Sequence, residues 1–185
     1  MSKTLRDSIF SVVYGGILGD VIGLPYEFAK RGRFIATDRI NYAENGYPIG
    51  TWSDDTSLTL CLIQNIIEDG DESELLNKFL SYFEKGKYTP YGYAFGIGKT
   101  TKNALLKYKL GLSPKECGLR DEKSNGNGSL MRIAPLVFSF RNTSNFAERV
   151  ELVKKYSEVT HAHPRSILAC IIYIETLYLL FNGQD

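Results

Sequence analysis

Apolar residues recur along most of this chain at the three- and four-residue spacing of amphipathic helices. The first series, Leu5, Ile9, Val12, Val13 and Ile17, predicts a helix near the N-terminus. Further helices are predicted from Ser53 to about Glu68, from Ser73 to Lys85, from just after Thr101 to about Leu110, from about Asn145 to Glu158, and from Ile167 to Phe181. No segment alternates apolar and polar residues as a half-buried strand does. We therefore predict an all-α fold, a compact multi-helix bundle in which residues 1–185 form one domain.

Turn-forming and capping residues divide these segments. Pro25, with the glycines around it, ends the first helix and leaves Glu27 on a constrained loop. Residues 30–50 combine Gly, Pro, Asn and mixed charge, which predicts a long loop. Asp71 is placed to cap the next helix, and Ser113 to Glu116 form a capping-box pattern with Pro114 at the first helical position.

Composition narrows the functional classes. Apolar residues make up 43% of the 185 and charged residues 23%, as in an ordinary soluble globular protein. The net charge of +1 gives no reason to expect a nucleic acid or an anionic membrane as partner. The three cysteines are scattered and lack metal-binding spacing, so we expect free thiols in a reducing, cytoplasmic compartment.

Two apolar runs resemble membrane-directed segments. The run from Ile9 to Gly19 is followed directly by Asp20 without a clear cleavage site, which argues against a signal peptide. The run from Ile167 to Phe181 is about 15 residues long and contains Glu175, so it is too short to span a bilayer. We expect the second run to form a buried helix whose apolar surface is only partly covered by this chain, and we expect no membrane-spanning segment.

The segment Gly50-Thr51-Trp52-Ser53-Asp54-Asp55-Thr56 has the strongest chemical signal. Two adjacent carboxylates repel each other and are costly to bury alone. They suit the first turn of a helix, where acidic residues complement the dipole. They equally suit a hard cation, which prefers oxygen ligands from Ser, Thr and Asp. Taken alone, this segment favours the helix cap.

Three other segments leave two interpretations open. Glu27 is either a solvated loop carboxylate or a functional acid. The Gly126-Asn127-Gly128-Ser129 turn is either a plain N-cap or a set of backbone amides for phosphate and ribose oxygens, at the start of a predicted helix. His161 and His163 are the only histidines, and we favour ligand binding or capping of the last helix over zinc.

Together, these segments resemble the ADP-ribosylglycohydrolase family. The resemblance depends on Gly19-Asp20-x-x-Gly23-x-Pro25-x-Glu27, Ser53-Asp54-Asp55-Thr56, Gly126-Asn127-Gly128-Ser129-x-Met131-Arg132 and Thr160-His161-x-His163-Pro164, in this order across nearly the whole chain. It implies an all-α fold, hydrolysis of ADP-ribosyl linkages and a binuclear Mg²⁺ or Mn²⁺ site.

The resemblance also implies a role for individual residues. Ser53, Asp54 and Asp55 would be metal ligands, and Glu27 with Asp55 would be catalytic. The residues that would bind the ADP-ribosylated substrate are Gly96, Gly98, Gly126, Asn127, Gly128, Ser129, Met131 and His161.

One departure from the family pattern affects the expected activity. Members of the family are longer and carry an Asp-x-Asp motif near the C-terminus, and nothing after Gly128 here reads Asp-x-Asp. The chain therefore resembles an N-terminal portion that lacks the C-terminal part of the fold. We expect little activity from it alone, and self-association or a complementing chain bound through the apolar last helix. The alternatives are a non-catalytic ADP-ribose-binding module or an interaction fragment.

Overall fold

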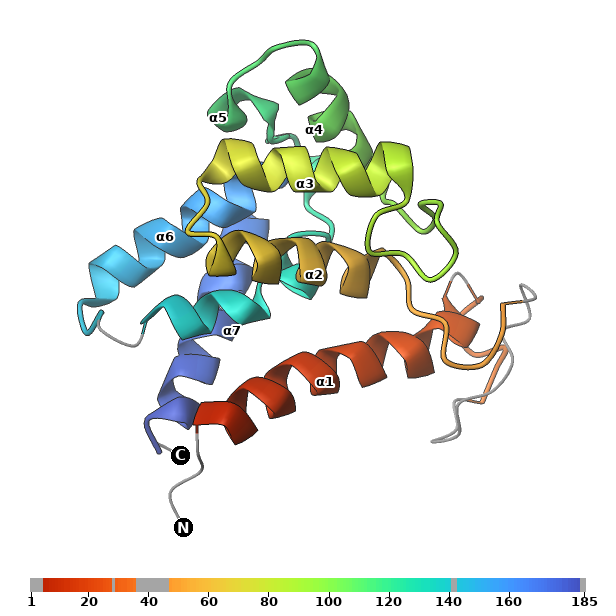
Figure 1. The fold of residues 1–185 in the computed structure, drawn as a ribbon, viewed down its shortest axis with the longest axis horizontal. Helices are drawn as coiled ribbons and strands as arrows, with labels where there is room; N and C mark the ends of the chain where they lie inside the picture. Colours follow the sequence, from red (N-terminus) through yellow and green to blue (C-terminus); the bar gives the residue numbers. More distant parts are fainter. Residues whose placement is uncertain (1–4, 28, 36–46, 141–142, 184–185) are drawn as a thin grey trace.

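The computed structural model describes residues 5–27, 29–35, 47–140 and 143–183, and helices joined by loops make up its secondary structure (Figure 1). Its α-helices are α1 Leu5–Gly23, α2 Asp54–Ile67, α3 Glu72–Lys85, α4 Lys99–Lys109, α5 Pro114–Cys117, α6 Phe146–Glu158 and α7 Pro164–Phe181. Short 3-10 helices are η1 Leu24–Tyr26, η2 Glu122–Ser124, η3 Leu130–Arg132 and η4 Ala134–Phe140. No strand occurs in the described ranges, where Leu119 and His161 form an isolated parallel bridge. The predicted all-α class is confirmed.

The helix ends follow the capping residues closely. Asp71 caps α3, accepting a hydrogen bond from the backbone N–H of Glu74 while the Glu74 side chain accepts one from Asp71. Ser113 and Glu116 form the expected capping box at α5. Of the long loop predicted at 30–50, residues 36–46 lie outside the described residues. Local sequence therefore sets most of the helix boundaries.

One expected helix does not form as an α-helix. The turn at Gly126–Ser129 leads into the 3-10 helix η3 and then into η4, rather than into a regular α-helix. Pro135 explains the difference, because it has no backbone N–H to donate to the carbonyl of Met131. The turn therefore lacks the long aligned helix whose dipole would strengthen an anion site.

The core is built around α2, which packs between α3 and η4. Leu58, Cys61 and Leu62 follow the helical spacing and are fully buried. Leu75 and Phe79 of α3 meet them from the other side in the same buried cluster. Truncating one such leucine to alanine typically lowers the free energy of unfolding by about 2–5 kcal/mol. The buried face of α2 therefore anchors this helix and the residues at its N-terminus.

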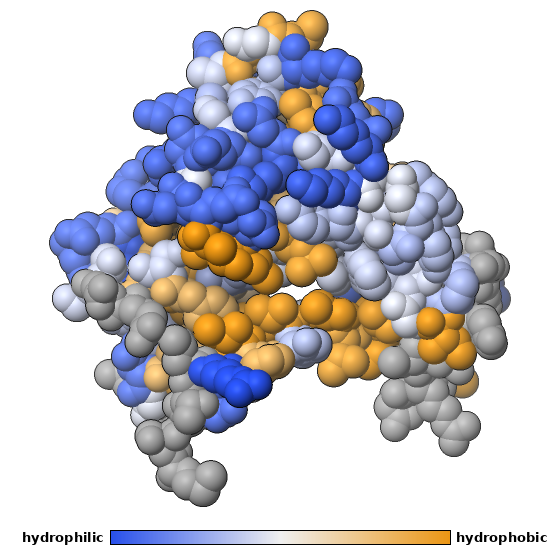
Figure 2. Space-filling model, in the orientation of Figure 1, coloured by the Kyte–Doolittle hydropathy of each residue, from blue (hydrophilic) through white to orange (hydrophobic). Residues whose placement is uncertain are grey.

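Helices α1 and α7 leave much apolar surface uncovered. Figure 2 shows hydrophobic side chains along α1 and along the elements facing it, on either side of an opening. A groove of about 360 Å³ between α1, α2 and η4 is lined by apolar residues that include Phe10 and Phe138. A second groove, of about 390 Å³, separates α1 from the C-terminal half of α7.

The last helix is therefore not buried on all sides within this chain. Ser166, Cys170 and Ile174 face the interior, whereas Ile172 and Leu180 are about 60% exposed. By length and composition, α1 and α7 would both be able to cross a membrane, a test that core helices of soluble proteins also pass. Cys61, Cys117 and Cys170 are buried free thiols.

Candidate active site

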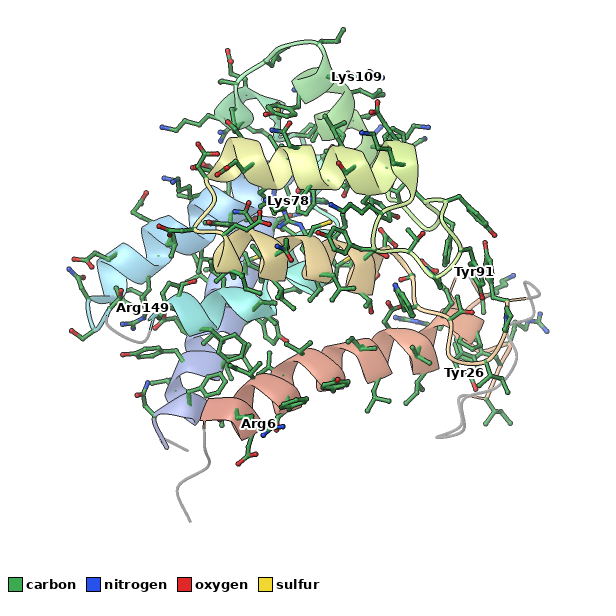
Figure 3. All side chains as sticks on the ribbon, viewed as in Figure 1. Arg6, Tyr26, Lys78, Tyr91, Lys109 and Arg149 are labelled. Atoms are coloured by element: carbon green, nitrogen blue, oxygen red, sulfur yellow. The ribbon has the colours of Figure 1, made fainter. Side chains whose placement is uncertain are left out.

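A cleft of about 460 Å³ lies where the C-terminal end of α1, the N-terminus of α2 and the loop before α4 meet. This is the side of the molecule on which Tyr26 and Tyr91 lie in Figure 3. The cleft is lined by Gly19, Asp20, Gly23, Leu24, Tyr26, Glu27, Ser53, Asp54, Asp55, Gly96, Gly98, Thr101, Asn127, Gly128 and Met131. Three of the four family motifs, together with the Gly96–Gly98 loop and Thr101, thus converge on one surface.

Asp20 holds the N-terminus of α2 against α1. Its Oδ2 accepts hydrogen bonds from the backbone N–H groups of Ser53 (2.9 Å) and Thr56 (3.1 Å) and from the Thr56 hydroxyl (2.7 Å). Its Oδ1 accepts a fourth from the Ser53 hydroxyl at 2.7 Å. The carboxylate of one helix therefore caps the next helix, and it sets the position of Asp54 and Asp55.

Ser53 is the N-cap residue of α2, so the cap interpretation of this segment holds. Its hydroxyl oxygen accepts a hydrogen bond from the backbone N–H of Asp55. The same hydroxyl lies 3.2 Å from Asp55 Oδ2. A cap does not exclude a second role, because Asp54 and Asp55 still present carboxylate oxygens to the cleft.

Burial and neighbouring negative charge raise the pKa of three carboxyl groups in this cleft. Burial, with the charges of Asp55 and Glu27, raises the pKa of Asp54 to about 7. Burial and the charge of Asp20 raise the pKa of Asp55. Partial burial and the charges of Asp55 and Asp20 raise the pKa of Glu27, although that residue is exposed at the rim. Neither these three groups nor Asp20 form an ion pair with a described Lys, Arg or His, so the cleft carries unbalanced negative charge.

Gly96 and Gly98 line the cleft in different ways. Gly96 adopts a positive φ of 77°, and a Cβ there would lie 2.6 Å from Asp54 Oδ1. The loop can therefore approach the Asp54 carboxylate only because residue 96 lacks a side chain. A Cβ at Gly98 would meet nothing within 4 Å. Gly96 has a steric reason to be glycine here, and Gly98 does not.

The turn after η2 contributes only part of its predicted surface to the cleft. Asn127, Gly128 and Met131 line it, whereas Gly126 does not. The Ser129 side chain is fully buried on the other side, where its Oγ lies at hydrogen-bonding distance, 2.9 Å, from the Ser157 hydroxyl. The sequence motif is therefore divided between ligand-facing and structural positions.

The two histidines have different surroundings. The Nδ1 of His163 accepts a hydrogen bond from the backbone N–H of Arg165, which makes His163 the N-cap of α7. His161 is 2% exposed and lies behind Gly128, so it does not line the cleft directly. Burial, with the charge of Arg132, lowers the pKa of His161 to about 4, so that its ring is neutral at physiological pH.

Sequence reasoning did not single out two residues that the fold brings to the site. Asp20 belongs to the first family motif, and its place in that motif, directly after Gly19, is the feature that could have identified it. Thr101 is 1% exposed, lines the cleft and lies beside Gly128. Nothing in the sequence near Thr101 distinguishes it from other helix residues, because its role depends on a contact made 27 residues later in the chain.

The oxygen atoms at the start of α2 are of the kind that bind a hard divalent cation. Asp54 and Asp55 offer carboxylate oxygens, Ser53 offers a hydroxyl, and a cation would relieve the repulsion that raises their pKa values. Among the described residues, no group of three His, Cys, Asp or Glu side chains is arranged to hold a metal ion. These residues therefore supply part of a coordination shell that needs about six oxygens.

Comparison of the sequence with known proteins identifies relatives of this chain. The ADP-ribosylglycohydrolase family model matches residues 1–185. The ADP-ribosylarginine hydrolase Tri1 of Pseudomonas putida (strain GB-1) is 32% identical over 97% of this chain and 48% of its own length. The ADP-ribosyl-[dinitrogen reductase] glycohydrolase of Rhodospirillum rubrum is 22% identical over 98% of this chain and 60% of its own length.

A solved structure has the same fold. The chain described as an ADP-ribosylglycohydrolase-related protein complex superposes with a TM-score of 0.80 at 26% identity, over 97% of this chain and 58% of that chain. The chain spans about half the length of two Tri1 proteins that it matches, 48% and 49%.

Proposed function

The chain belongs to the ADP-ribosylglycohydrolase family, and we propose that it forms part of a metal-dependent hydrolase that removes ADP-ribose from a protein or small-molecule acceptor. The observation that carries this proposal is the cleft itself, in which Asp20, Glu27, Asp54 and Asp55 converge without a cationic partner among the described residues. Such a cluster is costly unless it binds a cation or takes part in proton transfer. Two relatives are named as hydrolases of ADP-ribosylarginine, so this linkage is the first substrate to test.

The residues of the cleft can be matched to the steps of glycoside hydrolysis. Breaking the bond at the ribose C1″ develops oxocarbenium character, and a water must then attack this carbon. Glu27 is suited to proton transfer, because its raised pKa brings it closer to neutral pH and it stands at the rim, within reach of a leaving group or water. Asp55 would polarise the attacking water from the base of the cleft.

Ser53, Asp54 and Asp55 are the residues that would hold Mg²⁺ or Mn²⁺. When bound, such cations orient ribose hydroxyls and lower the pKa of bound water. The chain's own contribution is to fix these ligands, through the four hydrogen bonds to Asp20 and the close approach of Gly96 to Asp54.

We propose that the remaining cation ligands come from a helical segment equivalent to the part of the relatives that this chain does not span. Without them, the ligand set is too small to fix two cations, and we expect little or no turnover from this chain alone. An ADP-ribose-binding module without catalysis is the second candidate, and the incomplete donor set among the described residues favours it.

The apolar surface indicates where such a segment would pack. Grooves of about 360 and 390 Å³ flank α1, and α1 also carries Asp20 at the cleft. A helical partner with an apolar face would cover these grooves and reach the cleft along the same helix. The exposed side chains of Tyr14 and Leu18 on α1 and of Ile172 on α7 would contact the apolar face of such a partner.

A binding and turnover experiment tests the proposal. ADP-ribose binding by calorimetry and hydrolysis of ADP-ribosylarginine with Mn²⁺ would be measured on this chain, with Glu27→Gln and Asp55→Asn as site variants. Glu151→Gln, an exposed change on α6, is the matched control. We expect the parent chain and the control to bind ADP-ribose equally well, and we expect little hydrolysis from either. The proposal fails if the chain binds neither ADP-ribose nor Mn²⁺.

A further inference from the structure

Arg132 is a fully buried cation that the site described above does not use. Its guanidinium is 0% exposed and lies 4.7 Å above the Phe79 ring. Nη2 donates hydrogen bonds to the backbone carbonyl of Tyr156 and to the Thr160 hydroxyl, both at 3.1 Å. Nε and Nη1 have no hydrogen-bond partner among the described residues. Burying a guanidinium with so few partners is costly, which suggests that its charge has a role beyond packing.

The Thr160 hydroxyl connects this cation to His161. Thr160 Oγ1 accepts the hydrogen bond from Arg132, because a guanidinium can only donate. The same oxygen lies 2.9 Å from Nδ1 of His161. The hydroxyl proton of Thr160 has no other acceptor in the described part of the chain, so it is available to donate to Nδ1. The positive charge behind Thr160 also favours a lone pair, rather than an N–H, on the nitrogen that faces it.

The backbone around His161 is fixed as well. The His161 N–H donates to the Ser157 carbonyl at 2.9 Å, and the Ser157 hydroxyl donates to the His161 carbonyl at 3.1 Å. On either side, Leu119 exchanges hydrogen bonds with Thr160 and Ala162. The ring therefore has a defined position, and its Nδ1 hydrogen bond decides which nitrogen carries the proton.

The opposite edge of the ring faces the cleft wall. A Cβ on Gly128 would lie 2.6 Å from His161 Cε1, 3.0 Å from Nε2 and 3.1 Å from Thr101 Oγ1. Gly128 and Thr101 line the cleft. Nε2 of His161 and the Thr101 hydroxyl both lack a hydrogen-bond partner among the described residues. Two unused polar atoms therefore meet at Gly128, where only glycine leaves them room.

We propose that Arg132 and Thr160 are positioning residues that hold His161 in the Nε2–H tautomer, so that a neutral N–H donor stands at Gly128 for an oxygen acceptor of the bound ligand. The neutral state agrees with the pKa of about 4 that burial and Arg132 give this ring. A neutral donor at this position would bind a ribose or phosphate oxygen without adding charge to the cleft. The tautomer follows from the contacts alone, whereas the ligand rests on the proposed function.

Nuclear magnetic resonance of the whole ¹⁵N-labelled chain tests the tautomer without any ligand. Long-range ¹H–¹⁵N spectra show the ring nitrogens directly, and His161 and His163 are the only two histidines to resolve. A His163→Gln variant assigns the signals. We expect His161 to be protonated at Nε2 and unprotonated at Nδ1 from pH 7.5 down to about pH 5. An Nδ1–H ring, or a doubly protonated ring at pH 6, would overturn the inference.

Two variants of Thr160 test how the position is held. Thr160→Ser keeps the hydroxyl and should keep the tautomer, whereas Thr160→Val should allow a detectable Nδ1–H population. The valine variant should also lower ADP-ribose affinity about three- to tenfold relative to the serine variant. Unchanged spectra and affinity in a folded valine variant would refute the role of Thr160. If that variant does not fold, the spectra of the parent and the serine variant decide.

The two proposals can fail separately. A parent chain with the Nε2–H tautomer that does not bind ADP-ribose supports the positioning by Arg132 and Thr160 and contradicts the proposed function. A parent chain that binds ADP-ribose while His161 is protonated at Nδ1 contradicts only the positioning.

Discussion

The carboxylate of Asp20, on α1, accepts two hydrogen bonds from Ser53, one from the backbone N–H at 2.9 Å and one from the hydroxyl at 2.7 Å. This contact joins residues 33 positions apart and ties the first helix to the start of the second. Because Thr56 adds two more hydrogen bonds, one side chain fixes the backbone that carries Asp54 and Asp55. The site therefore depends on a helix that otherwise packs loosely.

Removing the Asp20 carboxylate should loosen both the fold and the site. We expect Asp20→Ala to lower the free energy of unfolding by about 2–4 kcal/mol, because up to four donors lose their acceptor. Mn²⁺ affinity should fall with it. Asp71→Ala, which removes the cap of α3, is the control and should cost about 1 kcal/mol without affecting Mn²⁺. Urea unfolding and calorimetry measure the two effects, and equal losses in both variants would contradict this role of Asp20.

Asp54 and Asp55 should bind the cation. Replacing each by asparagine removes a charge but keeps the side-chain shape, so we expect Mn²⁺ affinity to fall at least about tenfold in each variant. Calorimetric titration measures the affinity, with Glu151→Gln on the surface of α6 as the control. Unchanged affinity in both Asp variants would remove the metal assignment from this segment.

Without divalent cations, the chain should lose stability as pH rises. The pKa of Asp54 is raised from 3.8 to about 7, so the folded protein retains a proton that the unfolded chain releases between these values. The free energy of unfolding should therefore fall as pH rises from about 4 to about 7, by roughly 1–3 kcal/mol between pH 5 and 7.5.

Chemical denaturation at several pH values checks this dependence. Asp54→Asn should flatten it in part, since the raised pKa values of Asp55 and Glu27 act in the same direction. Saturating Mn²⁺ at pH 7.5 should restore stability to the parent. A free energy of unfolding that rises with pH in the parent chain would show that folding does not raise the pKa values of these carboxyl groups.

A side chain at position 128 should displace His161 rather than fill the cleft. The added Cβ of Gly128→Ala would point at the His161 ring, 2.6 Å from Cε1, so we expect a loss of about 1–3 kcal/mol in unfolding free energy and weaker ADP-ribose binding. Gly126→Ala is the matched control, because a Cβ there meets nothing within 4 Å. Denaturation and calorimetry on both variants test the difference. Equal behaviour of the two would mean that the turn shifts freely.

The apolar surface of α1 and α7 should cause association in solution. Leu18 and Ile172 are 51% and 59% exposed, so replacing them with Lys and Glu should reduce association while changing the free energy of unfolding by less than about 0.5 kcal/mol. Leu110→Lys is the control, because Leu110 is 81% exposed but lies at the end of α4, away from both helices. Light scattering after chromatography measures the size. A monomeric parent chain would contradict this prediction.

Much of this protein could be predicted from local sequence. Helical spacing and capping residues such as Asp71 and Asn145 determine the helix boundaries, because a cap depends on neighbours within a few positions. The motif around Ser53 likewise predicted both the start of a helix and an oxygen-rich site. Pro135 carried the information that the turn at 126–129 does not continue as an α-helix, since its effect is also local.

Only the tertiary structure decided which motif residues face the cleft. Ser129 and Met131 are two positions apart, yet Met131 lines the cleft and Ser129 bonds to Ser157 in the interior. Asp20 as the cap of α2, Gly96 against Asp54, and the Arg132–Thr160–His161 contacts all join distant positions. Such contacts depend on how helices pack, and the spacing of residues along the chain does not contain that information.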